Sequence, residues 1–131
     1  GTREPEVYGA ETLDDVEAMC AAHAAALDLS IDFRQSNFEG EMVTIIQQAR
    51  DNAAGIVINA GAYTHTSVAI HDALRVAELP VIEVHISNIH RREAFRHHSY
   101  ISAVAEGVIV GLGTQGYLFA LDAMARLLDR N

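Results

Sequence analysis

Two histidines of this sequence stand where short apolar segments end. His65 belongs to a polar cluster that follows the apolar residues 55–58, and His85 closes the apolar run 80–85. Apolar runs of this length, bounded by Gly, Pro or Asn, are typical of buried strands. Ligands of open α/β sheets bind at the carboxyl ends of the strands, so we expect both imidazoles in one crevice. Imidazole changes its charge near neutral pH, which suits it to proton transfer.

Glu83 and His85 lie two residues apart on the second apolar segment. Side chains at this spacing point to the same face of a strand. The carboxylate could therefore orient the imidazole and favour its protonated form, which makes His85 a candidate general acid. The alternative is a half-buried strand whose polar face is solvated, and the apolar character of the segment argues against it.

Arg3 and Tyr8 share a loop, residues 1–9, that contains two glycines and one proline. A nearby guanidinium favours the phenolate by Coulomb attraction, so Tyr8 could act as a general base near neutral pH. Because the loop is polar and must admit substrate and then exclude water, we expect it to be a mobile lid. The alternative is an ordinary surface loop whose tyrosine packs its ring.

Arg91, Arg92 and Arg96 form a basic segment after the second strand. Guanidinium binds carboxylate bidentately, so these residues suit an anionic substrate, although a solvated charged loop would look the same. Asn59 and His65 also have plain structural interpretations, as the cap of a turn and as a locally bonded residue at a helix start.

Composition excludes several classes of function. All nine basic residues are arginines, which rules out Schiff-base chemistry and a P-loop lysine. A net charge of −9 argues against non-specific binding of nucleic acid. His97 and His98 have no third ligand in a metal-binding pattern, so we expect no metal site.

The single cysteine, Cys20, has no partner for an internal disulfide, and we interpret it as a small buried residue. No segment is long and apolar enough to span a membrane, and no signal peptide is visible. A cytoplasmic, reducing compartment is therefore expected.

The elements that must position these groups alternate between strand and helix. Helices are predicted at 12–27, 39–51, 66–78 and 114–129, strands at 31–35, 55–58, 80–85 and 107–112, and a functional loop at 86–102. This alternation predicts one α/β domain, residues 1–131, with a doubly wound parallel sheet. Such a sheet usually begins with a strand that becomes central. We expect that strand upstream of Gly1, because residues 31–35 would otherwise have no partner.

Residues 111–116 match the spacing G-x-G-x-x-G between a predicted strand and a predicted helix. A dinucleotide site also needs a further strand and an acidic residue downstream, for which the chain leaves no room. We therefore interpret these glycines as a means of packing the helix tightly on the strand.

Taken together, these residues resemble type II 3-dehydroquinate dehydratase, a small flavodoxin-like enzyme of the shikimate pathway of aromatic amino acid biosynthesis. The matching tracts follow the family's order and spacing: Gly1-Thr2-Arg3-Glu4-Pro5-x-x-Tyr8-Gly9, Arg34-Gln35-Ser36-Asn37, Asn59-x-Gly61-Ala62-Tyr63-Thr64-His65-Thr66-Ser67, Glu83-Val84-His85-x-Ser87-Asn88, Arg96-His97-His98-Ser99 and Gly113-x-Gln115-Gly116-Tyr117. The resemblance implies a lyase that removes water from 3-dehydroquinate through an enolate, without a cofactor. It also implies trimers that group into dodecamers.

The resemblance assigns a role to each candidate residue. Tyr8 would remove the C2 proton with Arg3 beside it, and His85 would protonate the departing C1 hydroxyl with Glu83 orienting it. Substrate-binding positions are implied at Asn59, His65, Asp72, Ile86, Ser87 and Arg96, with Arg92 in the same polar shell.

Three departures from the family's pattern accompany these matches. Ala60 stands where the family often has Pro, and Phe38 stands where a His is common. Neither is expected to take part in the chemistry. The family's first strand and its Asn-containing loop have no counterpart here, and we expect them upstream of Gly1.

Two other functions compete with this one. A flavodoxin-like response regulator or nucleotide-binding module would need a lysine and an acidic cluster at its strand ends, and the chain has no lysine. A catalytically inactive oligomeric scaffold or small-ligand binding module is the second alternative. Retention of the catalytic residue types at their expected positions argues against it.

Overall fold

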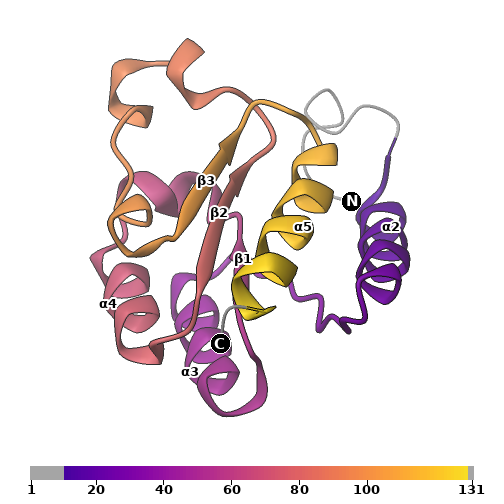
Figure 1. Cartoon of the computed structure of the whole chain (residues 1–131). Helices are drawn as coiled ribbons and strands as arrows, with labels where there is room; N and C mark the ends of the chain where they lie inside the picture. Colours follow the sequence, from indigo (N-terminus) through magenta and orange to yellow (C-terminus); the bar gives the residue numbers. More distant parts are fainter. Residues whose placement is uncertain (1–10, 130–131) are drawn as a thin grey trace.

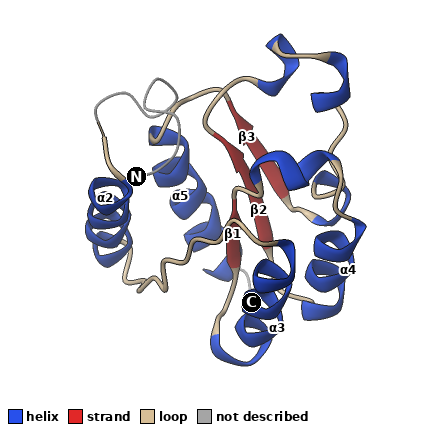
Figure 2. Cartoon of the chain, turned by 180° about the vertical axis from the view of Figure 1, so that it is seen from behind, coloured by secondary structure: helices blue, strands red, loops and turns tan. Residues whose placement is uncertain are grey.

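The computed structural model describes residues 11–129 and places a parallel sheet between layers of helices. The strands of this part of the chain are β1 (Ile56–Ile58), β2 (Val81–His85) and β3 (Gly107–Val110), in that order across the sheet. Its helices are α2 (Leu13–Ala26), α3 (Glu39–Asn52), α4 (Val68–Ala77) and α5 (Gln115–Asp129). Figures 1 and 2 show α3 and α4 on one face of the sheet, α5 on the other, and α2 outside α5. The predicted α/β class with a parallel sheet is confirmed.

Short 3-10 helices lie in the connections that follow β1 and β2. They are η1 (Gly61–His65), η2 (Ile89–Arg91), η3 (Ala94–Arg96) and η4 (Ser102–Val104). The segment expected to be a functional loop, residues 86–102, therefore contains η2 and η3 and ends where η4 begins.

β2 is the central strand of the described sheet and is buried along its whole length. Val81 packs in the cluster formed with α3 and α4, whereas Ile82 and Val84 pack against α5. Because side chains alternate along a strand, Glu83 and His85 share the face of Val81. The two ionisable residues therefore point into the layer between the sheet and the α4 side.

The four predicted helices are confirmed, each with ends within two residues of the expected ones. α2 begins with a capping box, in which the Asp15 N–H donates to Thr12 Oγ1 at 3.1 Å and the Thr12 N–H donates to the Asp15 carboxylate at 3.0 Å. α4 is capped by Ser67, whose Oγ accepts the Ile70 N–H at 2.9 Å.

The strand predicted at residues 31–35 is wrong. Its burial does alternate, since Ile31 and Phe33 pack against the α2–α5 cluster while Asp32 and Arg34 are exposed. A strand also needs a neighbour to pair with, and the described sheet consists of β1, β2 and β3 alone. The strand expected upstream of Gly1 lies outside the described residues and stays a prediction.

The glycines of residues 111–116 make the close packing that we expected of them. Gly111 and Gly113 have φ values of +85° and +64°, which favour glycine in the turn between β3 and α5. A Cβ added to Gly116 would lie 3.4 Å from the side chains of Ile109 and Val84. The first turn of α5 therefore sits directly on the sheet.

Cys20 is buried on the inner side of α2, and burial raises the pKa of its thiol. This agrees with the prediction of a small core residue. No helix between residues 11 and 129 is long and apolar enough to cross a membrane.

Candidate active site

Glu83 and His85 form a buried pair at the carboxyl end of β2. Nε2 of the imidazole lies 2.5 Å from Oε2 of the carboxylate, and the two residues are only 1% and 4% exposed. The predicted pairing of the two side chains on one face of the strand is therefore confirmed. Burial strengthens a hydrogen bond between such groups, so the carboxylate fixes the orientation of the imidazole.

Two serine hydroxyls complete the surroundings of the Glu83 carboxylate. Ser99 donates to Oε2 at 2.8 Å, and Ser102 donates to Oε1 at 2.6 Å. Burial alone would raise the pKa of Glu83, but the hydrogen bonds from His85, Ser102 and Ser99 outweigh burial and hold the pKa below its usual value. Glu83 is therefore an anion near neutral pH.

The charge on Glu83 determines which nitrogen of His85 carries a proton. An ionised carboxylate only accepts hydrogen bonds, so the facing Nε2 must donate. Nδ1 is then the ring nitrogen that can exchange a proton with a ligand. This is the arrangement that a general acid requires.

His65 lies beside His85 at the end of η1. The two rings are nearly parallel, with centroids 6.4 Å apart and an interplanar angle of 17°. Nδ1 of His65 donates to the carbonyl of His98 at 2.8 Å, which fixes the ring and leaves Nε2 for a ligand. The structure thus brings the two histidines together, as their positions after β1 and β2 predicted.

Asn59 follows β1 and is held by hydrogen bonds at both ends of its amide. Its Nδ2 donates to the hydroxyl of Tyr117 at 3.0 Å, and its Oδ1 accepts the N–H of Gly61 at 3.1 Å. The second contact caps the turn after β1, which is the structural interpretation of Asn59 given from the sequence. The half-buried position of the side chain also suits an amide that binds a ligand.

Arg92 and Arg96 lie on the loop that follows β2 and both approach Glu93. The side chain of Arg96 is 23% exposed with its Nε 3.2 Å from the carboxylate, and that of Arg92 is 43% exposed at 3.9 Å. Water screens ion pairs with a carboxylate as exposed as that of Glu93, so they contribute little to stability. Their guanidinium groups therefore stay available to another anion.

The remaining predicted residues have different settings. Ile86 is buried directly after β2, where its carbonyl accepts the N–H of Gly113 at 3.0 Å, and Ser87 is half-buried beside it. Asp72 is exposed on α4, and its role stays a prediction. Arg3 and Tyr8 lie outside the described residues.

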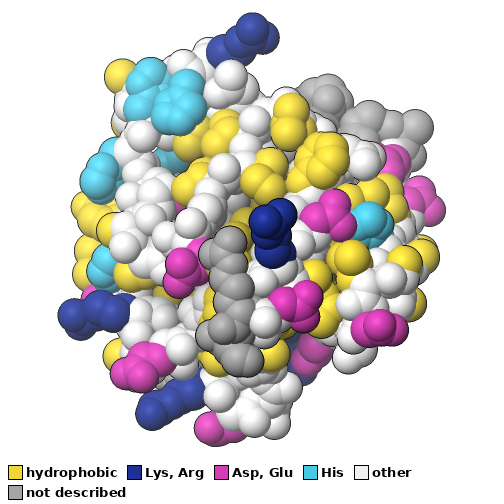
Figure 3. Space-filling model, viewed as in Figure 1, with side chains coloured by type: hydrophobic (Ala, Val, Ile, Leu, Met, Phe, Trp, Pro, Cys, Tyr) yellow, Lys and Arg dark blue, Asp and Glu magenta, His cyan; other side chains and the backbone are white. Residues whose placement is uncertain are grey.

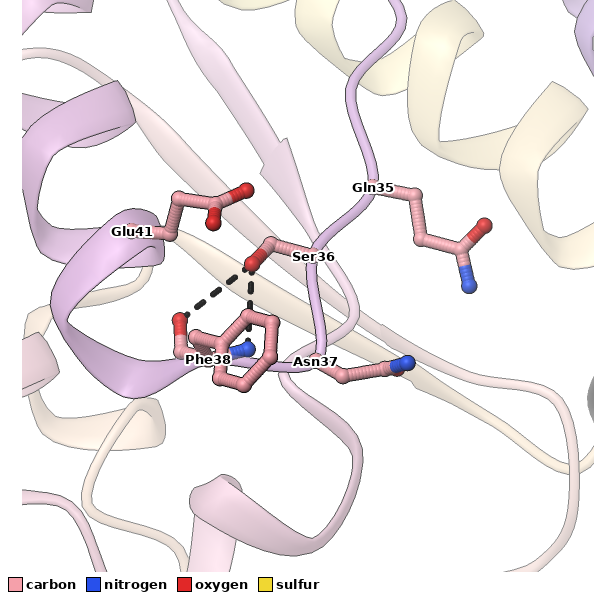
Figure 4. A pocket seen from close by; sticks show the side chains of 5 residues that line it. All are labelled: Gln35, Ser36, Asn37, Phe38 and Glu41. Atoms are coloured by element: carbon pink, nitrogen blue, oxygen red, sulfur yellow. Dashed lines mark hydrogen bonds between the residues drawn. The ribbon is translucent and has the colours of Figure 1, made fainter.

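A separate hollow of about 270 Å³ lies at the start of α3. Its lining consists of Gln35, Ser36, Asn37, Phe38 and Glu41 (Figure 4). The Phe38 N–H donates to Ser36 Oγ at 3.0 Å, and the hydroxyl of Tyr63 donates to the carbonyl of Asn37 at 2.9 Å. The hydrogen bond of Tyr63 links this hollow to η1. Neither Glu83 nor His85 lines the hollow.

Three supporting residues were not assigned roles from the sequence. Ser99 and Ser102 contact Glu83 across 16 and 19 positions of chain, and Tyr117 contacts Asn59 across 58. The useful signal was that a carboxylate on a buried strand needs hydrogen-bond donors. That requirement shows that donors exist but does not show which hydroxyls supply them.

The described part of the chain has no arranged set of metal ligands. No group of three or more His, Cys, Asp or Glu side chains between residues 11 and 129 is arranged to hold a metal ion. The residues described above instead offer an imidazole acid, a fixed amide, a second imidazole and exchangeable guanidinium groups. This set suits proton transfer on a small anionic molecule rich in oxygen.

Comparison with known proteins agrees with this chemistry. A curated 3-dehydroquinate dehydratase of Brucella canis is 60% identical over 127 residues, which cover 97% of this chain and 81% of the relative. A solved type II dehydroquinase from Propionibacterium acnes has a TM-score of 0.89 at 46% identity, covering 95% of this chain and 86% of that one. Another from Butyrivibrio crossotus has a TM-score of 0.88 at 44% identity, covering 94% and 86%.

The family resemblance and the flavodoxin-like fold that it implied are thereby confirmed. The model of the family described as dehydroquinase class II matches residues 1–125. The chain belongs to the class II dehydroquinase family.

Proposed function

We propose that the protein catalyses the reversible anti-elimination of water from 3-dehydroquinate, giving 3-dehydroshikimate in the shikimate pathway. The relatives named 3-dehydroquinate dehydratase support the substrate and the reaction. The observation that carries the chemistry is the buried Glu83–His85 pair, in which an anion holds an imidazole with one nitrogen left for a ligand. An inactive scaffold would have no use for such a pair.

The reaction needs a base and an acid on opposite faces of the substrate ring. Tyr8, as a phenolate supported by Arg3, removes the proton from C2, and the electrons of that bond move into the ketone to form an enolate. The enolate then collapses to the conjugated enone as the C1–O bond breaks. Nδ1 of the protonated His85 delivers its proton to the departing hydroxyl, which leaves as water.

Substrate binding is assigned to the groups around this pair. Arg96 pairs with the substrate carboxylate, since its guanidinium can exchange Glu93 for a ligand. The ring hydroxyls and the remaining polar atoms are held by Asn59, His65, Asp72, Ile86 and Ser87, with Arg92 in the same polar shell. No metal or organic cofactor is required, because a proton next to a ketone is acidic enough once donors stabilise the enolate. We place this reaction in the cytoplasm.

Tyr8→Phe tests the proposed reaction most simply in the full-length protein. Wild-type protein should convert 3-dehydroquinate to a product with the ultraviolet absorbance of a conjugated enone. Tyr8→Phe should nearly abolish turnover while substrate still binds, and Arg3→Ala should lower kcat by about two orders of magnitude. Near-normal kcat in Tyr8→Phe would remove Tyr8 as the base.

We also propose that the protein assembles as a dodecamer built from trimers. Large hydrophobic side chains are exposed on several elements, including Phe95 at 63% and Phe119 at 44%. Figure 3 shows hydrophobic side chains gathered over the face that carries α5. Closed symmetry is the usual way to bury such surface. Light scattering should report about twelve subunits, and a monomer at micromolar concentration would contradict the assembly.

A further inference from the structure

Ser99 occupies a position in which each of its hydrogen-bonding capacities is used. Its Oγ accepts the backbone N–H groups of Ile101 at 3.0 Å and Ser102 at 3.1 Å. A hydroxyl has two lone pairs and one hydrogen, so the hydrogen is left for Oε2 of Glu83, 2.8 Å away. The local backbone therefore sets the direction in which Ser99 donates.

Ser102 reaches the other oxygen of the same carboxylate. It begins η4, and its Oγ donates to Oε1 of Glu83 at 2.6 Å. Its backbone N–H is the one that Ser99 accepts, so the two serines are linked to each other as well as to Glu83. Together with Nε2 of His85, they give the buried carboxylate three donors on two oxygens.

The three hydrogen bonds to Glu83 stabilise the charge of its carboxylate as well as the loop that carries the serines. A carboxylate that is 1% exposed must be protonated or fully hydrogen-bonded, because an unpaired buried charge is strongly unfavourable. The ionised form accepts from both serines and from His85 more strongly than a neutral carboxyl would, because hydrogen bonds to a charged acceptor are the stronger ones. Ser99 and Ser102 thus stabilise the form of Glu83 that holds the imidazole through Nε2.

We propose that Ser99 and Ser102 are positioning residues, which act through Glu83 to hold His85 ready to donate its proton. The inference rests on the proposed dehydration and adds two residues to its machinery. Neither serine needs to touch the substrate. Their effect on the reaction passes entirely through the Glu83 carboxylate.

Within residues 11–129, the other neighbours of Glu83 and His85 do not donate side-chain hydrogen bonds to the Glu83 carboxylate. In the sheet, Glu83 is aligned with Ile58 and Val108, and His85 with Val110, all of which are apolar. His65 is the titratable side chain whose ring faces His85 among the described residues, and it is fixed by a backbone carbonyl. In the described part of the chain, the side-chain donors to Glu83 are therefore His85 and the two serines.

Ser102→Ala is the cleanest test, because it removes one donor to Glu83 without removing a backbone acceptor. The probe is the full-length protein with its glutamate carboxyl carbons labelled with carbon-13, and Glu83→Gln identifies the Glu83 signal. Loss of the Ser102 hydroxyl should move the Glu83 titration upward by about one pH unit. Ser102→Thr keeps a hydroxyl and should restore the wild-type titration.

Steady-state kinetics on 3-dehydroquinate give the second readout. Ser102→Ala should lower kcat about tenfold and leave KM unchanged, because the serine acts on the acid and not on the substrate. Ser99→Ala should have a larger effect, since it also releases two backbone N–H groups. Ser102→Thr should recover kcat.

Ser67→Ala is the matched control. Ser67 is also buried and also accepts a backbone N–H, but it caps α4 and makes no hydrogen bond with Glu83. This variant should unfold at a lower temperature while its kcat and Glu83 titration stay at the wild-type values. A structural role for the serines would instead make all three alanine variants alike.

The outcomes separate this inference from the proposed function. A wild-type protein that does not dehydrate 3-dehydroquinate would overturn the function, and the Glu83 titration would then still show whether the serines support the carboxylate. An active wild type with an unmoved Glu83 titration and an unchanged kcat in Ser102→Ala would overturn the role of the serines. A fall in kcat that Ser102→Thr does not rescue would also count against it.

Discussion

Two glutamates of this protein accept hydrogen bonds from basic side chains in opposite settings. Glu83 is buried on β2, with Nε2 of His85 2.5 Å away. Glu93 lies on the exposed loop between η2 and η3, with the guanidinium of Arg96 3.2 Å away. The pKa of Glu93 is lowered mainly by its own backbone N–H and further by Arg96 and Arg92. The pKa of Glu83 is also lowered, but against the opposing effect of burial.

The difference shows how burial divides a site into fixed and exchangeable parts. Water screens the exposed pair and competes for both partners, so Arg96 can leave Glu93 for a substrate carboxylate at little cost. The buried pair has no such competitor, and breaking it would leave a charge without a partner. One carboxylate therefore holds the proposed acid in place, while the other holds the proposed binding residue only loosely.

Of the changes that compare the two glutamates and their partners, replacing Glu83 should have the largest effect on activity. Glu83→Gln keeps the size of the side chain but removes the anion that accepts the hydrogen bond from Nε2 of His85. We expect kcat to fall about a hundredfold, as is typical when general acid catalysis is disabled. Steady-state kinetics give the value, and circular dichroism verifies the fold. A loss of less than threefold would mean that the buried pair has no role in the chemistry.

Replacing Arg96 should affect binding more than chemistry. Arg96→Ala removes the guanidinium proposed to pair with the substrate carboxylate, so KM should rise roughly tenfold or more. Arg96→Lys keeps the charge but loses the bidentate geometry and should give an intermediate KM. An unchanged KM in Arg96→Ala would assign the carboxylate to another residue.

The buried carboxylate should also affect acid stability. Because the folded state lowers the pKa of Glu83, its stabilising contribution is complete above the unfolded pKa, about 4.3. It is lost as the pH falls through the lower folded value. Below about pH 4, wild type should therefore lose stability with falling pH more steeply than Glu83→Gln. Urea unfolding at several pH values measures both slopes, and equal slopes would show that Glu83 is not held as an anion.

Replacing Glu93 should have the smallest effect. Glu93→Gln removes an exposed partner of Arg96, so kcat should be unchanged and KM should change by less than about twofold. The small difference in KM should disappear at high salt, because salt already screens the exposed pair. A large fall in kcat would show that Glu93 has a part in catalysis that its exposure gives no reason to expect.

The sequence predicted those parts of the fold that depend on local pattern. The four helices and the three described strands follow from apolar periodicity and from the Gly, Pro and Asn residues that bound the apolar runs. The prediction of a strand at residues 31–35 failed because strand pairing depends on two segments and not on one. Alternation between Ile31 and Phe33 describes which side is buried and cannot supply a neighbouring strand.

In the site too, features that depend on local pattern were predicted and contacts between distant segments were not. Glu83 and His85 could be paired from the sequence because two positions on one strand share a face. Ser99 and Ser102 could not be linked to Glu83, because the contact depends on how the chain returns to β2 after the exposed loop. The stacking of His65 on His85 likewise needed two strand ends to be placed side by side.

The measurement that tests the role of the buried pair most directly is the turnover of 3-dehydroquinate by His85→Ala. The full-length variant and the wild type are compared by the ultraviolet absorbance of the enone product, with circular dichroism to verify the fold. Wild type should form the enone, and His85→Ala should be slower by a factor of roughly 10² to 10⁴. A folded His85→Ala variant that works within a few-fold of wild type would contradict the assignment of His85 as the acid.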